Sequence, residues 1–218
     1  MTARKVLIWR HGRTQWNADG RIQGQADVAL DEIGQAQAKA AARLLAAEKP
    51  ELIISSDLVR AMDTARALGA LLNLPIEEDK RLRERHFGLW QGLTAEEAAE
   101  QYPAGYAAWR RGEQPDVDGV ETEAALTERL VAAVNDAAQR AEGAICVVTH
   151  GGAARRAVVG MLELPQEHAW RVEALGNCRW ANLRRGDRGW RLHAYNVGVA
   201  REDIPNVDAE PSSAAKAS

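Results

Sequence analysis

Two segments of the chain place basic side chains directly after apolar runs, at spacings that could build a site for an anion. The stretch VLIWRHG ends on Arg10 and His11, which are followed at once by Gly12. A second apolar run, AICVVTH, ends on His150 and is followed by Gly151. Guanidinium and imidazole groups bind phosphate oxygens, and a glycine lets backbone amides approach the same anion closely. The chemistry that these residues favour is the binding or transfer of a phosphoryl group.

The elements that must position these residues share one design. Three segments, which begin near residues 5, 50 and 143, each give a short continuous apolar run, a polar loop and a helix-prone stretch. Such runs are typical of strands that are covered on both faces. Arg60 follows the second run, in the first turn of its predicted helix. If the strands are parallel, Arg60 meets Arg10, His11 and His150 at one sheet edge, where α/β sheets bind ligands. Four such groups need an anion between them.

The remaining elements are predicted from capping residues and periodicity. Asp31 should cap a helix that runs through Ala47, Leu58–Leu72 should form a second helix, and Thr94 with Glu97 has the spacing of a capping box. Residues 122–142 favour a long amphipathic helix closed by Gly143, and residues 178–197 favour a two-stranded hairpin. We therefore expect one α/β domain over residues 1–200, in which 86–120 is an insertion that covers one end of the sheet. Residues 201–218 are small and polar, and we expect a disordered tail.

The bulk composition excludes several classes of protein. The 218 residues carry a formal net charge of −3, which argues against a general nucleic-acid or membrane binder, because such a protein needs a basic surface. The two cysteines, Cys146 and Cys178, make no disulfide framework, so a reducing compartment is expected. No apolar run is long enough for a signal peptide or a membrane span. We expect a cytoplasmic protein.

If the site does more than bind an anion, it needs a nucleophile and an acid. The chain has no G-x-S-x-G motif and no Walker glycine loop, and neither cysteine stands in a cluster of basic residues. Histidine remains, because a neutral imidazole can attack phosphorus near pH 7. An alkoxide is a poor leaving group, so a general acid is also required. Glu84 follows the extended segment PIEEDKRL and could reach the rim of the pocket.

Four motifs stand in order along the chain. They are RHGRTQWN at 10–17, SSDLVRAMDTA at 55–65, LRERHFGLWQG at 82–92 and VTHGG at 148–152. With them, the chain resembles the histidine phosphatase superfamily over about residues 5–195, in the branch that includes cofactor-dependent phosphoglycerate mutase. The resemblance implies a three-layer α/β/α sandwich with a mainly parallel central sheet. It also implies chemistry without a metal or other cofactor, and no metal-ligand spacing such as H-E-x-x-H is present.

The resemblance also implies roles for individual residues. His11 would become the phosphohistidine, and Glu84 would donate a proton and then act as the base for water. The phosphoryl group would be clamped by Arg10, Arg60 and His150, and the pocket would be completed by Asn17, Gln23, Gly24 and the backbone at Gly151. Arg13 departs from the family pattern, which commonly has Glu or Gln there. It either favours a substrate with a second anionic group or faces solvent.

Hydrolysis is favoured over mutase chemistry. Family mutases carry an extra stretch between a W-R-R element and the following long helix, and this chain has Trp109, Arg110 and Arg111 without that insert. The pocket should then stay open to water, and a phosphoenzyme should hydrolyse. Mutase-type phosphoryl transfer remains an alternative, as does a non-catalytic protein that binds a phosphorylated ligand. A zinc-dependent hydrolase lacks any local ligand pair.

Among the hydrolases, the chain is similar to the actinobacterial glucosyl-3-phosphoglycerate phosphatases. In that case a glycerate carboxylate would be met by Arg13, Arg85, Arg110 and Arg111. Trp90 and Trp109 are the aromatic candidates for the pocket. Sugar-phosphate, phosphoserine and α-ribazole-phosphate hydrolases share the same motifs, so the expected partner is a small phosphorylated metabolite. The later tryptophans are assigned to core or subunit packing, which leaves a homodimer open.

Overall fold

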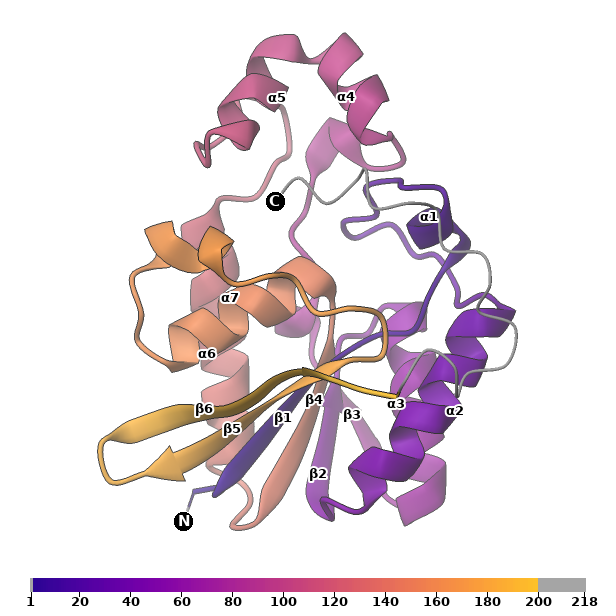
Figure 1. The fold of residues 1–218 in the computed structure, drawn as a ribbon, viewed down its shortest axis with the longest axis vertical. Coiled ribbons are helices and arrows are strands. Elements are labelled where there is room, and N and C mark those ends of the chain that lie inside the picture. Colours follow the sequence, from indigo (N-terminus) through magenta and orange to yellow (C-terminus); the bar gives the residue numbers. More distant parts are fainter. Residues whose placement is uncertain (1, 200–218) are drawn as a thin grey trace.

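A six-stranded sheet forms the centre of the molecule in the computed structural model, which describes residues 2–199 (Figure 1). The predicted tail at 201–218 lies outside the described residues. The strands stand in the order β3-β2-β4-β1-β5-β6. Their bounds are β1 Lys5–Arg10, β2 Pro50–Ser55, β3 Ile76–Glu78, β4 Ala144–Thr149, β5 Trp180–Gly186 and β6 Gly189–Val197. The first four are mutually parallel, and β5 pairs antiparallel with both β1 and β6, so the predicted mainly parallel sheet is confirmed.

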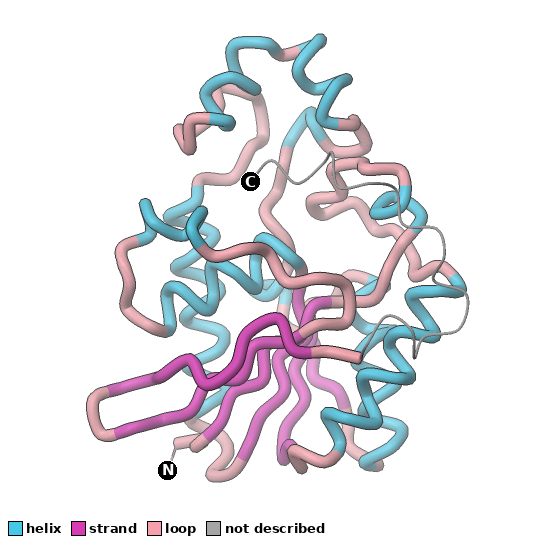
Figure 2. Tube along the Cα trace, viewed as in Figure 1, coloured by secondary structure: helices cyan, strands magenta, loops and turns pink. Residues whose placement is uncertain are grey.

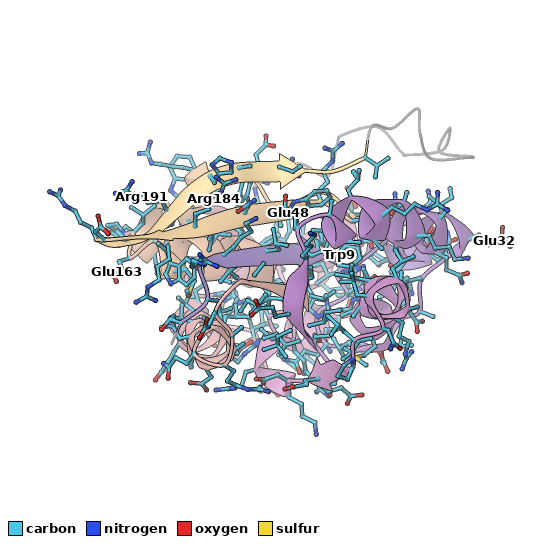
Figure 3. All side chains as sticks on the ribbon, turned by 90° about the horizontal axis from the view of Figure 1, so that it is seen from below. Trp9, Glu32, Glu48, Glu163, Arg184 and Arg191 are labelled. Atoms are coloured by element: carbon cyan, nitrogen blue, oxygen red, sulfur yellow. The ribbon has the colours of Figure 1, made fainter. Side chains whose placement is uncertain are left out.

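Helices cover both faces of this sheet (Figures 1 and 2). On β1, Val6 and Ile8 belong to a core cluster with α6 and α7, whereas Leu7 and Trp9 belong to a second cluster with α2 and α3. Because neighbouring residues of a strand point to opposite faces, the two clusters are the two sides of one sheet. Trp9, which is labelled in Figure 3, is fully buried. The apolar runs of the sequence thus reflect strands buried on both faces.

The helices lie close to the predicted positions. Their bounds are α1 Gln15–Ala18, α2 Glu32–Ala46, α3 Val59–Leu72, α4 Ala95–Gln101, α5 Pro103–Arg110, α6 Glu123–Ala138 and α7 Gly151–Met161, and the 3-10 turns are η1 Lys80–Leu82, η2 Gly88–Trp90 and η3 Gln166–Arg171. Asp31 caps α2 by accepting a hydrogen bond from the Gly34 amide, at 2.7 Å. Thr94 and Glu97 form the predicted capping box of α4. Over residues 2–199, no helix combines the length and apolar character needed to cross a membrane.

One predicted boundary is wrong. The long helix was expected to run to Gly143, but α6 ends at Ala138. The backbone amide of Ala3 donates to the carbonyl of Ala138 at 2.7 Å, so the end of α6 is tied to the start of the sheet. The amides of Glu142 and Gly143 donate to the carboxylate of Glu51, and the chain then enters β4. These partners lie far away in the sequence, and helix propensity carries no information about them.

The segment 86–120 carries α4 and α5, which stand beyond the carboxyl ends of the parallel strands (Figure 1). An aromatic cluster holds this segment together: Trp90, which is fully buried, packs edge-on against Tyr106 and Trp109 with ring centroids 6.3 and 5.7 Å away. At its base, Gly88 has a φ of +53°, and a Cβ there would lie 1.9 Å from the Asp118 carbonyl oxygen. The two ends of the segment therefore meet at a point where only glycine fits.

The hairpin of β5 and β6 extends the sheet on the other side. Arg184 and Arg191 are paired across it, and both side chains are exposed near the end of the hairpin (Figure 3). Charged side chains on an edge strand are typical of sheets that avoid pairing with other chains. The functional groups expected from the sequence lie elsewhere, at the carboxyl ends of β1, β2 and β4.

Candidate active site

His11 directly follows β1 and is almost completely buried. Its Nδ1 lies 2.7 Å from the carbonyl oxygen of Gly12. A carbonyl can only accept a hydrogen bond, so the proton of the neutral ring is on Nδ1. The lone pair is then on Nε2, at the other side of the ring. The local fold thus fixes the tautomer that can act as a nucleophile.

Arg60 and His150 lie beside His11. The ring centroids of His11 and His150 are 5.1 Å apart. Arg60 is fully buried on the first turn of α3, and its Nε donates to Nδ1 of His150 at 3.2 Å. The other ring nitrogen of His150, Nε2, therefore carries the proton and donates to the Ser56 hydroxyl at 2.9 Å. The terminal nitrogens of Arg60 donate to the carbonyls of Gly24 and Ala26 at 2.7 and 2.6 Å.

Arg10 occupies the remaining side of this group. Its guanidinium donates to the Leu175 carbonyl at 2.5 Å and lies against the start of α7. A Cβ on Gly151 would stand 3.2 Å from the guanidinium carbon, so the glycine allows this close approach. The structure thus brings together Arg10, His11, Arg60 and His150, the four groups that the strand-end argument placed at one edge.

Burial and positive charge act together on the two histidines. Loss of hydration lowers the pKa of His11 and of His150 well below 6.5, and the neighbouring charges of Arg60 and Arg10 lower both further. Burial also lowers the pKa of Arg60 to about 10, which still leaves this guanidinium charged at neutral pH. The site therefore holds two neutral imidazoles and two cations, an arrangement that attracts an anion.

These shifts predict a loss of stability in acid. Below pH 6.5 the unfolded chain protonates both histidines, whereas the folded protein keeps them neutral until a much lower pH. Because the unfolded state binds more protons in that interval, the free energy of unfolding should fall as the pH falls, by up to about 1 kcal/mol per pH unit for each histidine. Above pH 6.5 this contribution is constant. Urea unfolding of the wild type at a series of pH values measures it.

Two variants separate this effect from general acid denaturation. His11→Gln should make the dependence on pH between about pH 6.5 and pH 5 shallower, because one titrating ring is removed. His193→Gln is the control, since His193 is an exposed residue of β6. Equal slopes in the wild type and in His11→Gln would contradict the assignment of a neutral, buried His11.

Glu84 lies at the amino end of α7. Its carboxylate accepts hydrogen bonds from the amides of Gly152, Ala153 and Arg85, each at 2.9 Å. Gly152, whose amide binds the carboxylate, directly follows Gly151, where the Arg10 guanidinium approaches the helix. A Cβ on Gly152 would stand 2.9 Å from the carboxylate, so this glycine also leaves room for the observed position. Glu84 thus stands at the margin of the four-residue group.

The other expected pocket residues line the loop after β1. Asn17 caps α1 together with Thr14, and its Oδ1 accepts from Asn177 Nδ2 at 3.2 Å. Gln23 is buried, and its Oε1 has no hydrogen-bond partner among residues 2–199. Gly24 has a φ of +51° and gives its carbonyl to Arg60. This loop therefore contributes to the site largely by holding Arg60.

The residues proposed to meet a glycerate group have other partners in the structure. Arg13 forms an ion pair with Asp31 at 2.8 Å, at the cap of α2. Arg85 is buried, and its guanidinium donates to the Glu121 carbonyl and to Gln114. Trp109 packs into the aromatic cluster of the 86–120 segment. Arg110 and Arg111 end α5 at the surface, and Arg111 is paired with Glu113.

Sequence reasoning missed three groups that support the site. The Ser56 hydroxyl accepts from His150, Thr64 accepts from the Gly12 amide at 3.0 Å, and Asn177 donates to the His11 carbonyl at 3.2 Å. A signal existed for Thr64, since it lies four residues after Arg60 on one helix face. Ser56 stands in the same motif. No sequence signal pointed to Asn177, which reaches the site from the loop before β5.

No group of three or more potential metal-ligating side chains (His, Cys, Asp or Glu) gathers within residues 2–199. The charged groups that act on His11 are instead the guanidinium groups of Arg60 and Arg10, which are donors for an anion.

Comparisons with known proteins agree with the motifs. The family profile described as "Histidine phosphatase superfamily (branch 1)" matches residues 6–198. The chain is 37% identical over 218 residues to a glucosyl-3-phosphoglycerate phosphatase of Mycolicibacterium vanbaalenii, covering 91% of this chain and 97% of that protein. It is 41% identical over 157 residues to a metal-independent phosphoserine phosphatase of Arabidopsis thaliana, covering 69% and 66%. A solved mycobacterial glucosyl-3-phosphoglycerate phosphatase in complex with VO3 superposes with a TM-score of 0.81 at 36% identity, covering 90% of this chain and all of that one.

Proposed function

Because the chain belongs to branch 1 of the histidine phosphatase superfamily and is a phosphatase of small phosphorylated metabolites, we propose that it hydrolyses its substrate through a phosphohistidine on His11. The observation that carries this proposal is the hydrogen bond from His11 Nδ1 to the Gly12 carbonyl at 2.7 Å. It leaves the lone pair on Nε2, and the lowered pKa of His11 keeps the ring neutral and nucleophilic.

In the first step, Nε2 of His11 attacks the phosphorus atom and the bond from phosphorus to the ester oxygen breaks. The oxygens of the transferring group carry negative charge, which Arg10, Arg60 and the Nε2 proton of His150 stabilise. In this step the Nε2 proton of His150 leaves the Ser56 hydroxyl and forms a hydrogen bond to a phosphate oxygen. Glu84 gives its proton to the leaving alkoxide, and the alcohol departs.

In the second step, water replaces the alcohol. Glu84, now a carboxylate, takes a proton from water while the water oxygen attacks the phosphorus of phosphohistidine. The bond from phosphorus to Nε2 breaks, and inorganic phosphate and neutral His11 are regenerated. This proton stays on Glu84 and is given to the leaving group of the next substrate, while the amides of Gly152 and Ala153 hold the carboxyl group beside the site, at 2.9 Å each. One carboxyl group thus serves as the acid and then as the base.

Hydrolysis rather than mutase transfer is supported by the segment over the site. Only residues 111–122 separate α5 from α6, so the chain has no additional cover between Arg110 and Glu123. Water can then reach the phosphohistidine. We propose glucosyl-3-phosphoglycerate as the substrate, because mycobacterial phosphatases named for it match about nine-tenths of this chain. Phosphoserine is the second candidate, favoured by the plant relative.

A substrate panel tests this proposal. The purified protein should release inorganic phosphate from glucosyl-3-phosphoglycerate with a kcat/KM about tenfold or more above that for 3-phosphoglycerate or phosphoserine. Analysis of the products formed from 3-phosphoglycerate should find inorganic phosphate and no 2-phosphoglycerate. A higher kcat/KM for phosphoserine would favour the second candidate, and the appearance of 2-phosphoglycerate would favour a mutase.

A further inference from the structure

Arg155 of α7 has a positively charged guanidinium that takes no part in the proposed mechanism. Its Nε is inaccessible to solvent and has no hydrogen-bond partner. No hydrogen bond or ion pair joins its guanidinium to any other residue between 2 and 199. The next residue, Arg156, provides the contrast: it forms an ion pair with Glu123 and donates to the Gln166 carbonyl at 2.8 Å. A buried donor without a partner is costly, so the unpaired Nε requires an explanation.

The position of Arg155 on its helix places it beside the reacting groups. It lies four residues after Gly151 and three after Gly152, so it shares a helix face with both. Side chains on a helix lean toward its amino end. A Cβ on Gly151 would stand 3.2 Å from the Arg10 guanidinium carbon, and the Gly152 amide donates to the Glu84 carboxylate at 2.9 Å. Arg155 is therefore next to the acid that serves the leaving group, and it is partly exposed, so a ligand can reach it.

The charges around Arg155 do not neutralise it. Burial lowers its pKa and the neighbouring charge of Arg156 lowers it further, while Glu84, Tyr195 and Glu123 act in the opposite direction with smaller effects. Glu84 already accepts three backbone amides, and Glu123 is paired with Arg156. The hydroxyl of Tyr195 donates to the Glu173 carbonyl. Each of the acidic neighbours is thus engaged elsewhere, and an additional anion is what the guanidinium lacks.

Building on the proposed function, we infer that Arg155 is a specificity-determining residue that binds a carboxylate on the leaving alcohol. With the phosphate between Arg10 and Arg60, the ester oxygen points to Glu84, and the next atoms of the alcohol pass the face of α7 that carries Arg155. A guanidinium offers a fork of donors that matches a carboxylate. The favoured substrate class is then phosphomonoesters of hydroxy acids, and simple alcohol phosphates lack the matching group.

The test compares two esters that differ at one group. 3-Phosphoglycerate and glycerol 3-phosphate are both primary phosphate esters of a three-carbon alcohol, but only the first carries a carboxylate. Inhibition constants for both are measured against the hydrolysis of p-nitrophenyl phosphate, so the result does not depend on whether either ester is turned over. In the wild type, 3-phosphoglycerate should bind about tenfold more tightly or better, the factor expected for one charge-assisted hydrogen bond.

Arg155→Met should reduce this preference to about threefold or less. Arg155→Lys keeps the charge without the fork and should give an intermediate preference. Arg156→Met is the matched control: it should lower the melting temperature, because it breaks the pair with Glu123, and should retain the preference. Arg155→Met should not lower the melting temperature, since no partner is lost.

Several outcomes would overturn the inference. They are a wild type without preference, an Arg155→Met variant with the wild-type preference, and an Arg155→Met variant that no longer hydrolyses p-nitrophenyl phosphate, which would place Arg155 at the phosphate or at Glu84. Failure of the wild type to hydrolyse p-nitrophenyl phosphate would instead contradict the proposed function.

Discussion

Replacement of His11 by alanine should lower kcat by roughly 10⁴-fold or more for every phosphomonoester. In the proposed mechanism the His11 imidazole attacks phosphorus, and Arg10, Arg60 and His150 would remain to bind the phosphate without being able to accept it. KM should therefore change much less than kcat. Steady-state hydrolysis of p-nitrophenyl phosphate measures both constants.

Two controls accompany His11→Ala: one tests whether the variant is folded, and the other tests whether replacing a histidine elsewhere in the protein also lowers activity. The melting temperature checks the fold, because the buried ring leaves a small cavity. His193→Ala, on the exposed edge strand β6, should retain kcat within about twofold, the expectation for a surface position away from the site. If His11→Ala keeps a tenth of the wild-type activity, His11 is not the nucleophile.

Replacement of Glu84 by glutamine should slow alkyl esters far more than aryl esters. Glutamine keeps the size of the side chain but cannot donate a proton to an alkoxide, and general acid catalysis typically contributes roughly 10²–10⁴-fold. A nitrophenolate leaves without protonation, so its release should lose little. The comparison is kcat/KM for glycerol 3-phosphate and for p-nitrophenyl phosphate in both proteins.

Glu100→Gln makes the same chemical change on the exposed surface of α4 and should alter neither rate. An equal loss on the two esters in Glu84→Gln would show that the carboxylate holds the site together and does not transfer a proton to the leaving group. In Glu84→Gln, hydrolysis of the phosphoenzyme formed from the aryl ester can also be slower. That result would fit the second role of Glu84, as the base for water.

The gathering of Arg10, His11, Arg60 and His150 could be predicted because it depends on local information. Each residue follows an apolar run, and the rule that parallel strands end at a common edge brings them together. β1 and β4 are neighbours in register, with Arg10 opposite Thr149, so the residues that follow both strands emerge side by side. The motif order then indicated the superfamily, and the expected three-layer arrangement of the α/β fold followed from it.

The partners of the outer arginines could not be predicted. A sequence shows that Arg13 and Arg85 carry charge, but their partners, Asp31 and the Glu121 carbonyl, are chosen by tertiary contacts. The same limit applies to Asn177, which approaches from a loop distant in the sequence. Arg155 is a further example, because only the structure shows that its Nε is buried without a partner.

The most direct test of the account is to trap phosphate on His11. Glu84→Gln should form the phosphoenzyme quickly from radiolabelled p-nitrophenyl phosphate and hydrolyse it slowly, so that the label accumulates. After a quench in base, the label should be stable to alkali, labile to acid and located on the peptide that carries His11, and His11→Ala should remain unlabelled. Label on another residue, or turnover in the wild type with no label on His11 in either protein, would contradict the phosphohistidine mechanism.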